Sequence, residues 1–436
     1  MLIFLWTDLL VYLLLLLTLI AIYFAMRNKH TRARWFKVYR RPSRIIASMI
    51  LMVFVVVGLL DSIHYVPKAD TINNIKSLLD KLLYPISTLA EKSYSAPFAT
   101  HLFIPDMHKD DSGAISWIAA PLQYVSPVSI WNCIGQGLID TIIIFSFCIA
   151  LAWLVLRKYK NVRNINRTSM FTILITYAAI LLVTCTCAHL MQHYHIFGTD
   201  KIGEDVFYSS LKSVRTGLII GILATVLTLP FAVLFGAMAG YFRGWIDDLI
   251  QYLYTTLSSI PGVLLIAAAM LSLDAVIARH SNAFTYMAQR ADARLLLLCA
   301  ILGVTSWTTL CRILRGETLK LRDQEFILSA RVIGLNNMQI IIKHIVPNLL
   351  HIILISLILD FSGLVLAEAV LSYVGVGVDA SMFSWGNMIN AARTEMGRDP
   401  VIWWSLTGAF VMMFMLVLAA NIFADGVRDA FDPRTA

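Results

Sequence analysis

The sequence predicts an all-α polytopic membrane protein, a transmembrane helical bundle with about nine spans. Of its 436 residues, 58% are hydrophobic and only 14% are charged, whereas soluble domains average about 45–50% and about 25%. The apolar residues also gather in stretches of about 20, the length of a helix that crosses a bilayer. A water-soluble body of this size cannot bury so many apolar side chains. The composition therefore excludes a soluble enzyme, a disordered chain and a secreted disulfide scaffold.

Nine stretches are long and apolar enough to form spans. They are residues 3–26, 45–66, 134–156, 169–189, 216–239, 250–273, 294–311, 345–367 and 404–424. The first has no basic n-region and no small-residue cleavage site, so we predict a helix there and not a signal peptide. Pro230 and Pro261 fall inside the fifth and sixth spans, where a proline permits a kink.

The basic residues predict the orientation of these spans. Segments 27–44 and 157–167 carry eight and five Lys/Arg residues and no acidic residue, and such loops lie in the cytoplasm. With nine spans, the N-terminus then lies outside and the C-terminus lies in the cytoplasm. The net charge of +8 is therefore interpreted as a topology signal, and we expect no nucleic acid as a partner.

Signals of chemistry are few. The six cysteines include no CxxC pair and are interpreted as packing residues. No G-x-x-x-x-G-K-[ST] loop is present, so if ATP drives this protein, another chain must bind the nucleotide. We expect no enzyme activity and no cofactor.

Two regions on the outer side of the predicted bundle leave alternatives open. Segment 67–132 is the longest stretch between spans, and it lies along the outer membrane face, forms a small lid or serves as a packed connector. Its apolar spacing predicts an amphipathic helix over 72–83. Cys185, His189 and His193 share one helical face, but no carboxylate completes a metal site there, so we predict none.

Segment 312–346, between the seventh and eighth predicted spans, predicts a helix–turn–helix. In the stretch from Glu325 to Asn348, the first helix ends near Gly334, a residue suited to a left-handed cap. A second, amphipathic helix leads to Pro347. By itself this pattern also fits an ordinary inner loop.

The segment resembles the cytoplasmic coupling loop of ABC importer permeases, whose pattern is E-A-A, three residues, Gly, nine residues, then I-x-L-P. Ala330, Gly334 and Pro347 stand at the matching spacing, while Leu328 replaces the Glu and Ser329 the first Ala. The resemblance implies that a groove on an ATPase subunit receives this loop. It also implies the coupling residues, which are Glu325, Ser329, Ala330, Arg331, Gly334 and Pro347.

Four more blocks resemble the dipeptide/oligopeptide/nickel permease family of ABC importers. They begin at His195-Ile-Phe-Gly-Thr-Asp, at Ala239-Gly-Tyr-Phe-Arg-Gly-Trp, at Glu368-Ala-Val-Leu-Ser-Tyr, with Ser384-Trp-Gly following, and at Asp425-Gly-Val-Arg-Asp. Glu204 stands where the family usually has Arg. The five blocks lie in order over residues 195–433, somewhat over half of the chain.

The resemblance implies a MetI-like permease core at 195–433, with the coupling loop at 312–346. Before it we place N-terminal transmembrane helices with a basic cytoplasmic loop (1–66), an extracytoplasmic segment (67–132) and an additional transmembrane helix pair (133–194). The second span matches the first helix of the family, so the first, third and fourth spans are additions.

The family also implies the function and the partners. We expect a subunit without chemistry of its own that moves di- or oligopeptides across a bacterial inner membrane by alternating access. Its partners would be a second homologous permease in a heterodimer, two ABC ATPase subunits and an extracytoplasmic substrate-binding protein. The alternatives are a permease for nickel or another small solute, a membrane scaffold with degenerate coupling, and an ion-coupled secondary transporter.

Carboxylates inside spans are the candidates for the pathway, because a membrane-buried acid is costly and usually functional. Asp360 lies in the eighth span, where it either contacts a peptide ammonium group or hydrogen-bonds between helices. Glu368, near the end of the same span, is the second candidate. Asp140 is interpreted as interfacial, although in a secondary transporter it would act with Asp360. Trp131, Trp403 and Trp404 are assigned to an aromatic belt.

Overall fold

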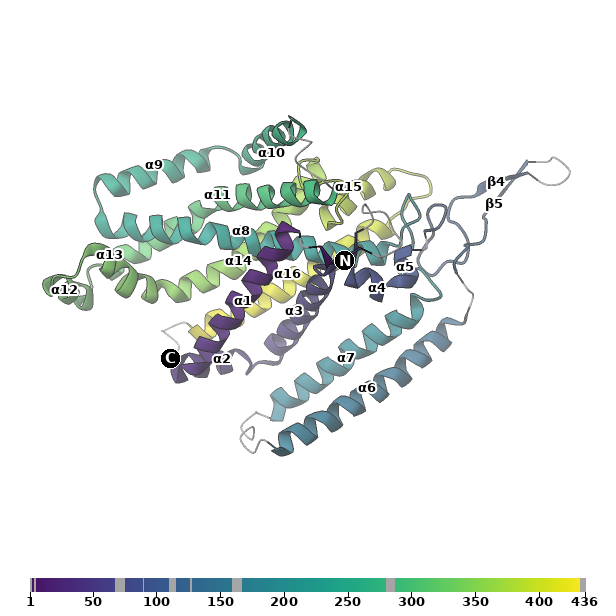
Figure 1. The fold of residues 1–436 in the computed structure, drawn as a ribbon, viewed down its shortest axis with the longest axis horizontal. Coiled ribbons are helices and arrows are strands. Elements are labelled where there is room, and N and C mark those ends of the chain that lie inside the picture. Colours follow the sequence, from purple (N-terminus) through teal and green to yellow (C-terminus); the bar gives the residue numbers. More distant parts are fainter. Residues whose placement is uncertain are drawn as a thin grey trace. The chain divides into compact units, whose positions relative to one another are not determined.

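A computed structural model describes residues 2–3, 5–66, 75–88, 90–109, 115–125, 128–158, 167–279 and 287–431. Helices dominate these residues (Figure 1), and nine of the described helices are long and apolar enough to cross a membrane. The prediction of an all-α polytopic bundle is therefore confirmed. Residues 159–166 of the second basic segment and the last predicted block beyond Phe431 lie outside the described residues.

The chain divides into two compact units. The first comprises residues 1–3, 39–215 and 383–419, and the second comprises residues 4–38, 216–382 and 420–436. The helices α8 (Val206–Phe242) and α16 (Trp404–Phe431) have residues in both units.

The first unit contains three long helices that precede α8, together with shorter helices and strands. Its helices are α3 (Pro42–Asp61), α4 (Leu78–Leu82), α5 (Tyr84–Thr88), α6 (Ile130–Lys158), α7 (Arg167–Leu190) and α15 (Trp385–Glu395). Its strands β1 (Leu2–Ile3), β2 (His64–Tyr65) and β3 (Lys76–Ser77) form a small antiparallel sheet in that order, and β4 (Asp106–Lys109) pairs with β5 (Ile115–Ile118) as a hairpin.

The amphipathic helix predicted over 72–83 is shorter in the structure. Residues 72–74 lie outside the described residues, and α4 begins only at Leu78. The Ser77 side chain accepts a hydrogen bond from the Asp80 N–H at 3.2 Å, and the Asp80 carboxylate accepts one from the Ser77 N–H at 2.8 Å. This capping box fixes the start of the helix, a local signal that outweighs the hydrophobic spacing upstream.

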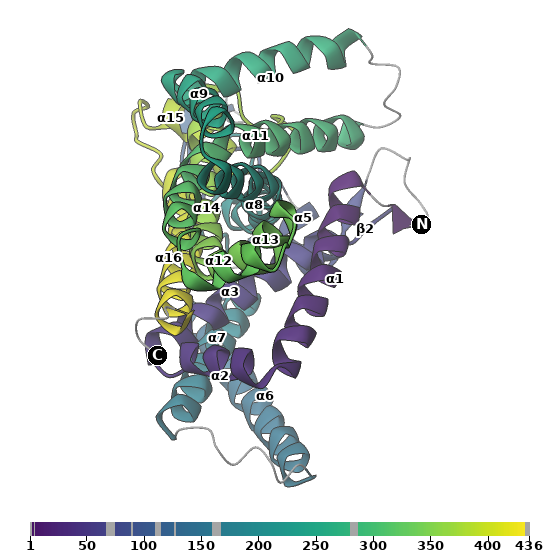
Figure 2. The same cartoon turned by 90° about the vertical axis from the view of Figure 1, so that its left-hand side faces the viewer.

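The second unit is built around α11 (Met287–Leu321), which contributes to both of its main apolar cores. Its other elements are α1 (Trp6–Arg27), α2 (Lys29–Val38), α9 (Trp245–Ser259), α10 (Gly262–Arg279), α12 (Glu325–Val332), α13 (Asn337–Ile340), the π-helical turn η2 (Ile341–Ile345) and α14 (Val346–Val374). Figure 2 shows α9, α10, α11 and α12 from a second direction. The Thr7 N–H at the start of α1 donates to the Asp292 carboxylate of α11 at 3.1 Å. This hydrogen bond joins α1 to α11.

Eight of the nine predicted spans each coincide with one helix, and several helices extend beyond the predicted limits. The exception is 250–273, which the structure divides into α9 and α10 at Ile260 and Pro261. Proline has no N–H and disfavours helical backbone in the residue before it. The apolar stretch was therefore located correctly, but the prediction of one continuous helix was wrong.

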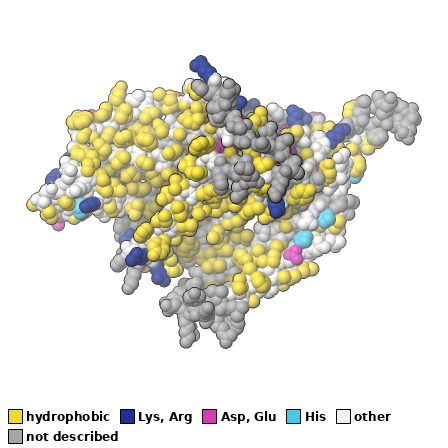
Figure 3. Space-filling model, viewed as in Figure 1, with side chains coloured by type: hydrophobic (Ala, Val, Ile, Leu, Met, Phe, Trp, Pro, Cys, Tyr) yellow, Lys and Arg dark blue, Asp and Glu magenta, His cyan; other side chains and the backbone are white. Residues whose placement is uncertain are grey.

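The surfaces of the long helices are apolar. In Figure 3, hydrophobic side chains cover most of the visible face, and charged side chains are sparse. No residue in the apolar window of α1 is buried, and Phe147 of α6 is 68% exposed. Such surfaces would aggregate in water and are stable in lipid, as expected of a multi-pass membrane protein.

Candidate functional site

The turn between α12 and α13 has the geometry predicted for it. Gly334 adopts φ +87°, in the left-handed region. Its N–H donates to the Arg331 carbonyl at 3.0 Å, and the Leu335 N–H donates to the Ala330 carbonyl at 3.2 Å. These two bonds form a Schellman motif, the C-terminal cap that glycine favours. The motif stops α12 and reverses the chain toward α13.

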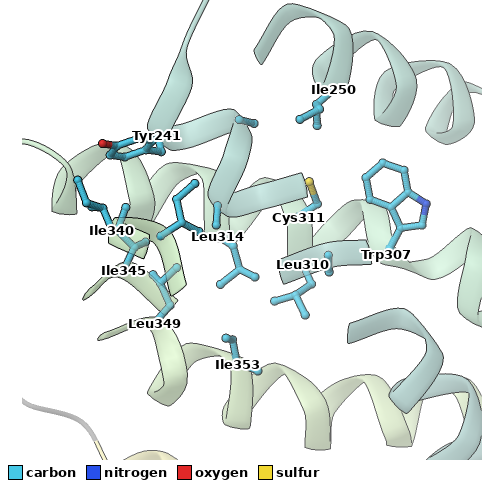
Figure 4. Close-up of a cluster of buried hydrophobic side chains, with 14 of the residues drawn as sticks. Tyr241, Ile250, Trp307, Leu310, Cys311, Leu314, Ile340, Ile345, Leu349 and Ile353 are labelled. Atoms are coloured by element: carbon cyan, nitrogen blue, oxygen red, sulfur yellow. The ribbon is translucent and has the colours of Figure 1, made fainter. Parts of the chain in front are cut away.

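One side of this helical hairpin is packed into the second unit. Ile327 and Ala330 of α12 and Ile340 of α13 are buried in one apolar core. That core also contains Leu310 and Leu314 of α11, together with Tyr241 of α8 and Ile250 of α9 (Figure 4). The inner side of the hairpin is therefore part of the same apolar core as α8 and α11.

Tyr241 makes the polar contacts between the hairpin and the core beneath it. Its hydroxyl donates to the Asn337 Oδ1 at 3.0 Å, and its carbonyl accepts a hydrogen bond from the Arg322 guanidinium at 2.8 Å. The Arg331 guanidinium lies 5.5 Å from the centre of its ring, within cation–π range. Arg331 was a predicted coupling residue, but the role of Tyr241 was not predicted, although it lies in one of the family-like blocks.

The other side of the hairpin is exposed and unusually apolar. Val332 is 88% exposed and Ile333 is 79% exposed, next to the capping glycine. Glu325 and Ser329 are exposed on the same helix. We call Glu325, Ser329, Val332, Ile333 and Gly334 the outward face. Two bare aliphatic side chains at a loop tip outside every candidate span are typical of a contact surface for another protein.

The second helix of the hairpin continues without a break into the membrane. α13, η2 and α14 form one helical run from Asn337 to Val374. Pro347, a predicted coupling residue, lies in its exposed part and has no N–H for the carbonyl four residues earlier. The π turn that precedes it accommodates this loss, with the Val346 N–H donating to the Ile341 carbonyl, five residues back. The second helix of the hairpin and the following membrane helix are thus one continuous helical element.

The first helix of the hairpin follows α11, which is clamped to its neighbours. The Arg315 guanidinium makes two hydrogen bonds to the Asp247 carboxylate of α9, at 2.6 and 2.8 Å. Such bidentate pairs are strong and directional. On α8, a Cβ at Gly240 would lie 2.5 Å from the Thr318 Cβ and 2.7 Å from the Arg315 carbonyl oxygen. The helices α8 and α11 therefore touch backbone to backbone here.

The two pathway candidates lie on α14 in different surroundings. Glu368 is 1% exposed, and its carboxylate accepts a hydrogen bond from the Ser372 hydroxyl at 2.7 Å. Asp360 is partly exposed, and its Oδ2 has no hydrogen-bond partner among the described residues. Asp360 is thus the candidate that the described chain leaves unsatisfied, whereas Glu368 belongs to the packed interior of its unit.

The histidines at the end of α7 have a carboxylate nearby, contrary to the expectation that none was present. His189 Nε2 lies 2.7 Å from the Asp140 Oδ2 of α6, so Asp140 pairs with the neighbouring helix, and its place at the membrane interface stays a prediction. Among the described residues, no group of three or more His, Cys, Asp or Glu side chains is placed to hold a metal ion. The pair is a polar link between two apolar helices.

The block that begins at His195 organises the first unit. His195 Nδ1 lies 2.7 Å from the Asp205 carboxylate. Thr199 Oγ1 accepts a hydrogen bond from the Ser95 N–H at 2.7 Å, and the Thr199 carbonyl accepts one from the Trp404 indole at 2.9 Å. Trp404 is buried, so its assignment to an aromatic belt was wrong. These contacts join α16 to the segment around Ser95 and indicate a structural role.

A buried ion pair in the first unit was also not predicted. Lys212 Nζ of α8 lies 2.8 Å from the Asp80 carboxylate of α4, which the Tyr208 hydroxyl also donates to at 2.8 Å. Burial alone would raise the pKa of Asp80, but the attraction of Lys212 and its hydrogen bonds outweigh burial and lower that pKa. The ion pair ties part of segment 67–132 to α8, which favours the packed connector over a free lid.

Comparisons with known proteins agree with these features. A profile of the family described as "Binding-protein-dependent transport system inner membrane component" matches residues 232–436. The oligopeptide transport system permease protein OppC of Haemophilus influenzae is 32% identical over 249 residues, which cover 57% of this chain and 73% of that protein. OppC of Bacillus subtilis is 30% identical, over 55% of this chain and 72% of its own length. The dipeptide transport system permease protein DppC of Bacillus subtilis is 28% identical, over 55% and 69%.

Proposed function

The chain belongs to the oligopeptide and dipeptide permease family of binding-protein-dependent transport system inner membrane components, and from this we propose that it is a membrane subunit of an ABC importer for peptides. It performs no chemistry itself. ATP hydrolysis belongs to partner chains, and this subunit converts their movement into opening and closing of a peptide pathway.

The outward face of the α12–α13 hairpin supports this proposal most directly. It combines the exposed Val332 and Ile333 with a glycine cap, and the opposite side of the hairpin belongs to the same apolar core as α8 and α11. An ATPase groove that covers the two aliphatic side chains removes them from water. Closure of the ATPases then moves the hairpin as a rigid body together with its helices.

The complete importer in this proposal has several further parts. Two ABC ATPase subunits engage the hairpins, a second homologous permease completes the pathway, and an extracytoplasmic binding protein delivers the peptide. The hairpin lies in the cytoplasm, as do the basic helix α2 and the C-terminus, while the N-terminus lies outside. Alternating access follows: binding of ATP opens the pathway outward, and hydrolysis returns it inward.

Binding of the ATPase subunits to the outward face can be tested by introducing a charged side chain there. Val332→Asp should reduce co-purification of the ATPase subunits with the permease by about tenfold or more, because a carboxylate would be desolvated in an apolar groove. Lys320→Asp, a change at another exposed residue of the same region, is the matched control and should keep the ATPases bound. Equal recovery of ATPase with Val332→Asp and with the unchanged chain would remove the proposed docking surface.

Asp360 remains our proposed pathway carboxylate. The residue is partly exposed, while its Oδ2 is buried and has no hydrogen-bond partner among the described residues. A peptide ammonium group that reaches the carboxylate would form a charge-assisted hydrogen bond, which contributes about 1.5–3 kcal/mol. Asp360→Asn should therefore raise the KM for peptide uptake at least about tenfold, with the amount of inserted protein unchanged. Uptake of peptides with an unaltered KM would show that Asp360 serves packing instead.

A further inference from the structure

The helix that should cross the membrane between α8 and α11 is interrupted. α9 ends at Ser259 and α10 begins at Gly262. Because Pro261 has no N–H, the helical ladder stops: the Ile260 N–H bends back to the Leu257 carbonyl at 3.4 Å, and the Leu264 and Leu265 N–H groups both reach the Pro261 carbonyl, at 2.9 and 3.1 Å. Figures 1 and 2 show α9 and α10 running in different directions on the two sides of this break.

Three contacts with α11 show at which height along that helix the break lies. Asp247 pairs with Arg315 at 2.6 Å, Tyr254 lies under the Arg312 guanidinium at 5.1 Å, and Asp274 pairs with Arg294 at 3.2 Å. α9 and α10 together thus run antiparallel along α11, and interpolation between these contacts puts the break level with the part of α11 around Thr305. Ile260 lies 13 residues after Asp247 and 14 before Asp274.

The stretch of α11 opposite is the part that lies in hydrocarbon. Residues 295–311 carry no charged side chain, and with their flanking arginines they form a helix of about 30 Å, the thickness of the hydrocarbon layer. α10 alone is long and apolar enough for a span, but its contacts and those of α9 set the two helices beside this stretch of α11, and we therefore infer that the break lies near the middle of the bilayer. Irregular backbone at this depth is stable only where protein buries it or where it lines a water-filled cavity, because lipid offers no hydrogen bonds.

The described chain does not bury the break. Ser258, Ser259, Ile260, Pro261 and Gly262 are all exposed, as are the hydroxyl-bearing Thr255 and Thr256 just before them. The last carbonyls of α9 carry partial negative charge, and the first N–H groups of α10 carry partial positive charge. The Ser259 hydroxyl donates to the Thr256 carbonyl at 2.7 Å, and its oxygen can still accept a hydrogen bond. The exposed residues of the break include hydroxyl groups and helix ends of both signs, and none of them carries a charged side chain.

We propose that residues 255–262 line the transport pathway at the bilayer midplane and hydrogen-bond the main chain of the passing peptide. This inference rests on the proposed peptide import. The ligand class follows from the chemistry: a peptide offers N–H and C=O groups along its length and opposite charges at its ends, whatever its side chains. Backbone dipoles and hydroxyls therefore recognise peptides in general.

Water access and peptide contact are tested together with single cysteines. The importer, with its ATPases, second permease and binding protein, is reconstituted after the six native cysteines are replaced. Ser259→Cys and Thr256→Cys are each compared with Leu271→Cys, an apolar residue of α10 that is 62% exposed. A charged, membrane-impermeant thiosulfonate should label the first two at least about tenfold faster than the third, since lipid excludes the reagent. Saturating tripeptide during turnover should slow that labelling several-fold.

Each other outcome overturns the inference. Equally slow labelling of all three cysteines, with and without ATP, means that lipid or the second permease covers the break. Fast labelling that tripeptide does not slow means an aqueous site that the peptide does not contact. ATP-dependent tripeptide uptake by the same reconstituted variants separates the two proposals: uptake with unprotected cysteines removes only the assignment of the break, whereas absence of uptake by the cysteine-free parent removes peptide import itself.

Discussion

Replacement of Gly334 by valine is expected to abolish ATP-driven peptide uptake while the protein still inserts in the membrane. Gly334 adopts φ +87° at the cap of α12, and a β-branched residue in that conformation costs about 1–3 kcal/mol. The strain is relieved by unwinding the cap, which breaks the hydrogen bonds of Gly334 and Leu335 to α12. Because a Cβ placed here meets no atom within 4 Å among the described residues beyond its two chain neighbours, the core beneath the hairpin stays intact. Uptake of labelled peptide into proteoliposomes should fall at least about tenfold.

The asparagine variant is the matched control for this prediction. Asn tolerates left-handed backbone much better than valine, so Gly334→Asn should keep the cap and retain most of the uptake. If Gly334→Asn fails as completely as Gly334→Val, then close approach of the ATPase, and not the backbone conformation, requires glycine. Normal uptake with Gly334→Val would contradict the role of the hairpin altogether.

Replacement of Gly240 by leucine is expected to prevent stable assembly of the second unit. A Cβ at this position would lie 2.5 Å from the Thr318 Cβ and 2.7 Å from the Arg315 carbonyl oxygen. These are parts of α11 that cannot rotate away, so α8 and α11 must separate. Overpacking usually costs about 1–3 kcal/mol and occasionally more, and here the separation also strains the Asp247–Arg315 pair. Thermal unfolding of the detergent-purified protein should show a clear fall in Tm and in yield.

Gly316 provides the control for Gly240. It lies on α11 one residue beyond Arg315, and a Cβ there meets no atom within 4 Å. Gly316→Leu should therefore leave Tm close to that of the unchanged protein. A similar loss of Tm in both variants would mean that helix propensity or lipid contact decides the effect. An unchanged Tm with Gly240→Leu would mean that α8 and α11 do not pack as described.

The local features of the coupling hairpin could be predicted from the sequence, because each of them depends on a few adjacent residues. The cap at Gly334 and the helix that it ends follow from backbone preference and helical periodicity. The inward position of Ala330 follows from the match to a family pattern. The contacts of Tyr241 with Arg331 and Asn337 could not be predicted, because they join residues about 90 positions apart. Membership of Tyr241 in a family-like block was the only available signal.

The same limit explains the other differences. Asp140 and His189 are 49 residues apart, so the interhelical pair was invisible in either span alone. Trp404 begins a span and fitted the aromatic belt, yet its indole donates to the Thr199 carbonyl inside the first unit. The division of 250–273 was missed for another reason. Hydropathy averaged over about 20 residues is hardly changed by the single residue Pro261, but a proline at that position interrupts the helix.

The most direct test of the account is peptide uptake into proteoliposomes that contain this chain, the second permease and the ATPases, with binding protein outside. We expect uptake of labelled oligopeptide that requires ATP, stops when this chain is omitted, and is unaffected by collapse of proton and sodium gradients. Uptake that an ion gradient drives without ATP would contradict the account and indicate a secondary transporter. ATP-driven uptake that persists without this chain would reduce it to an accessory subunit.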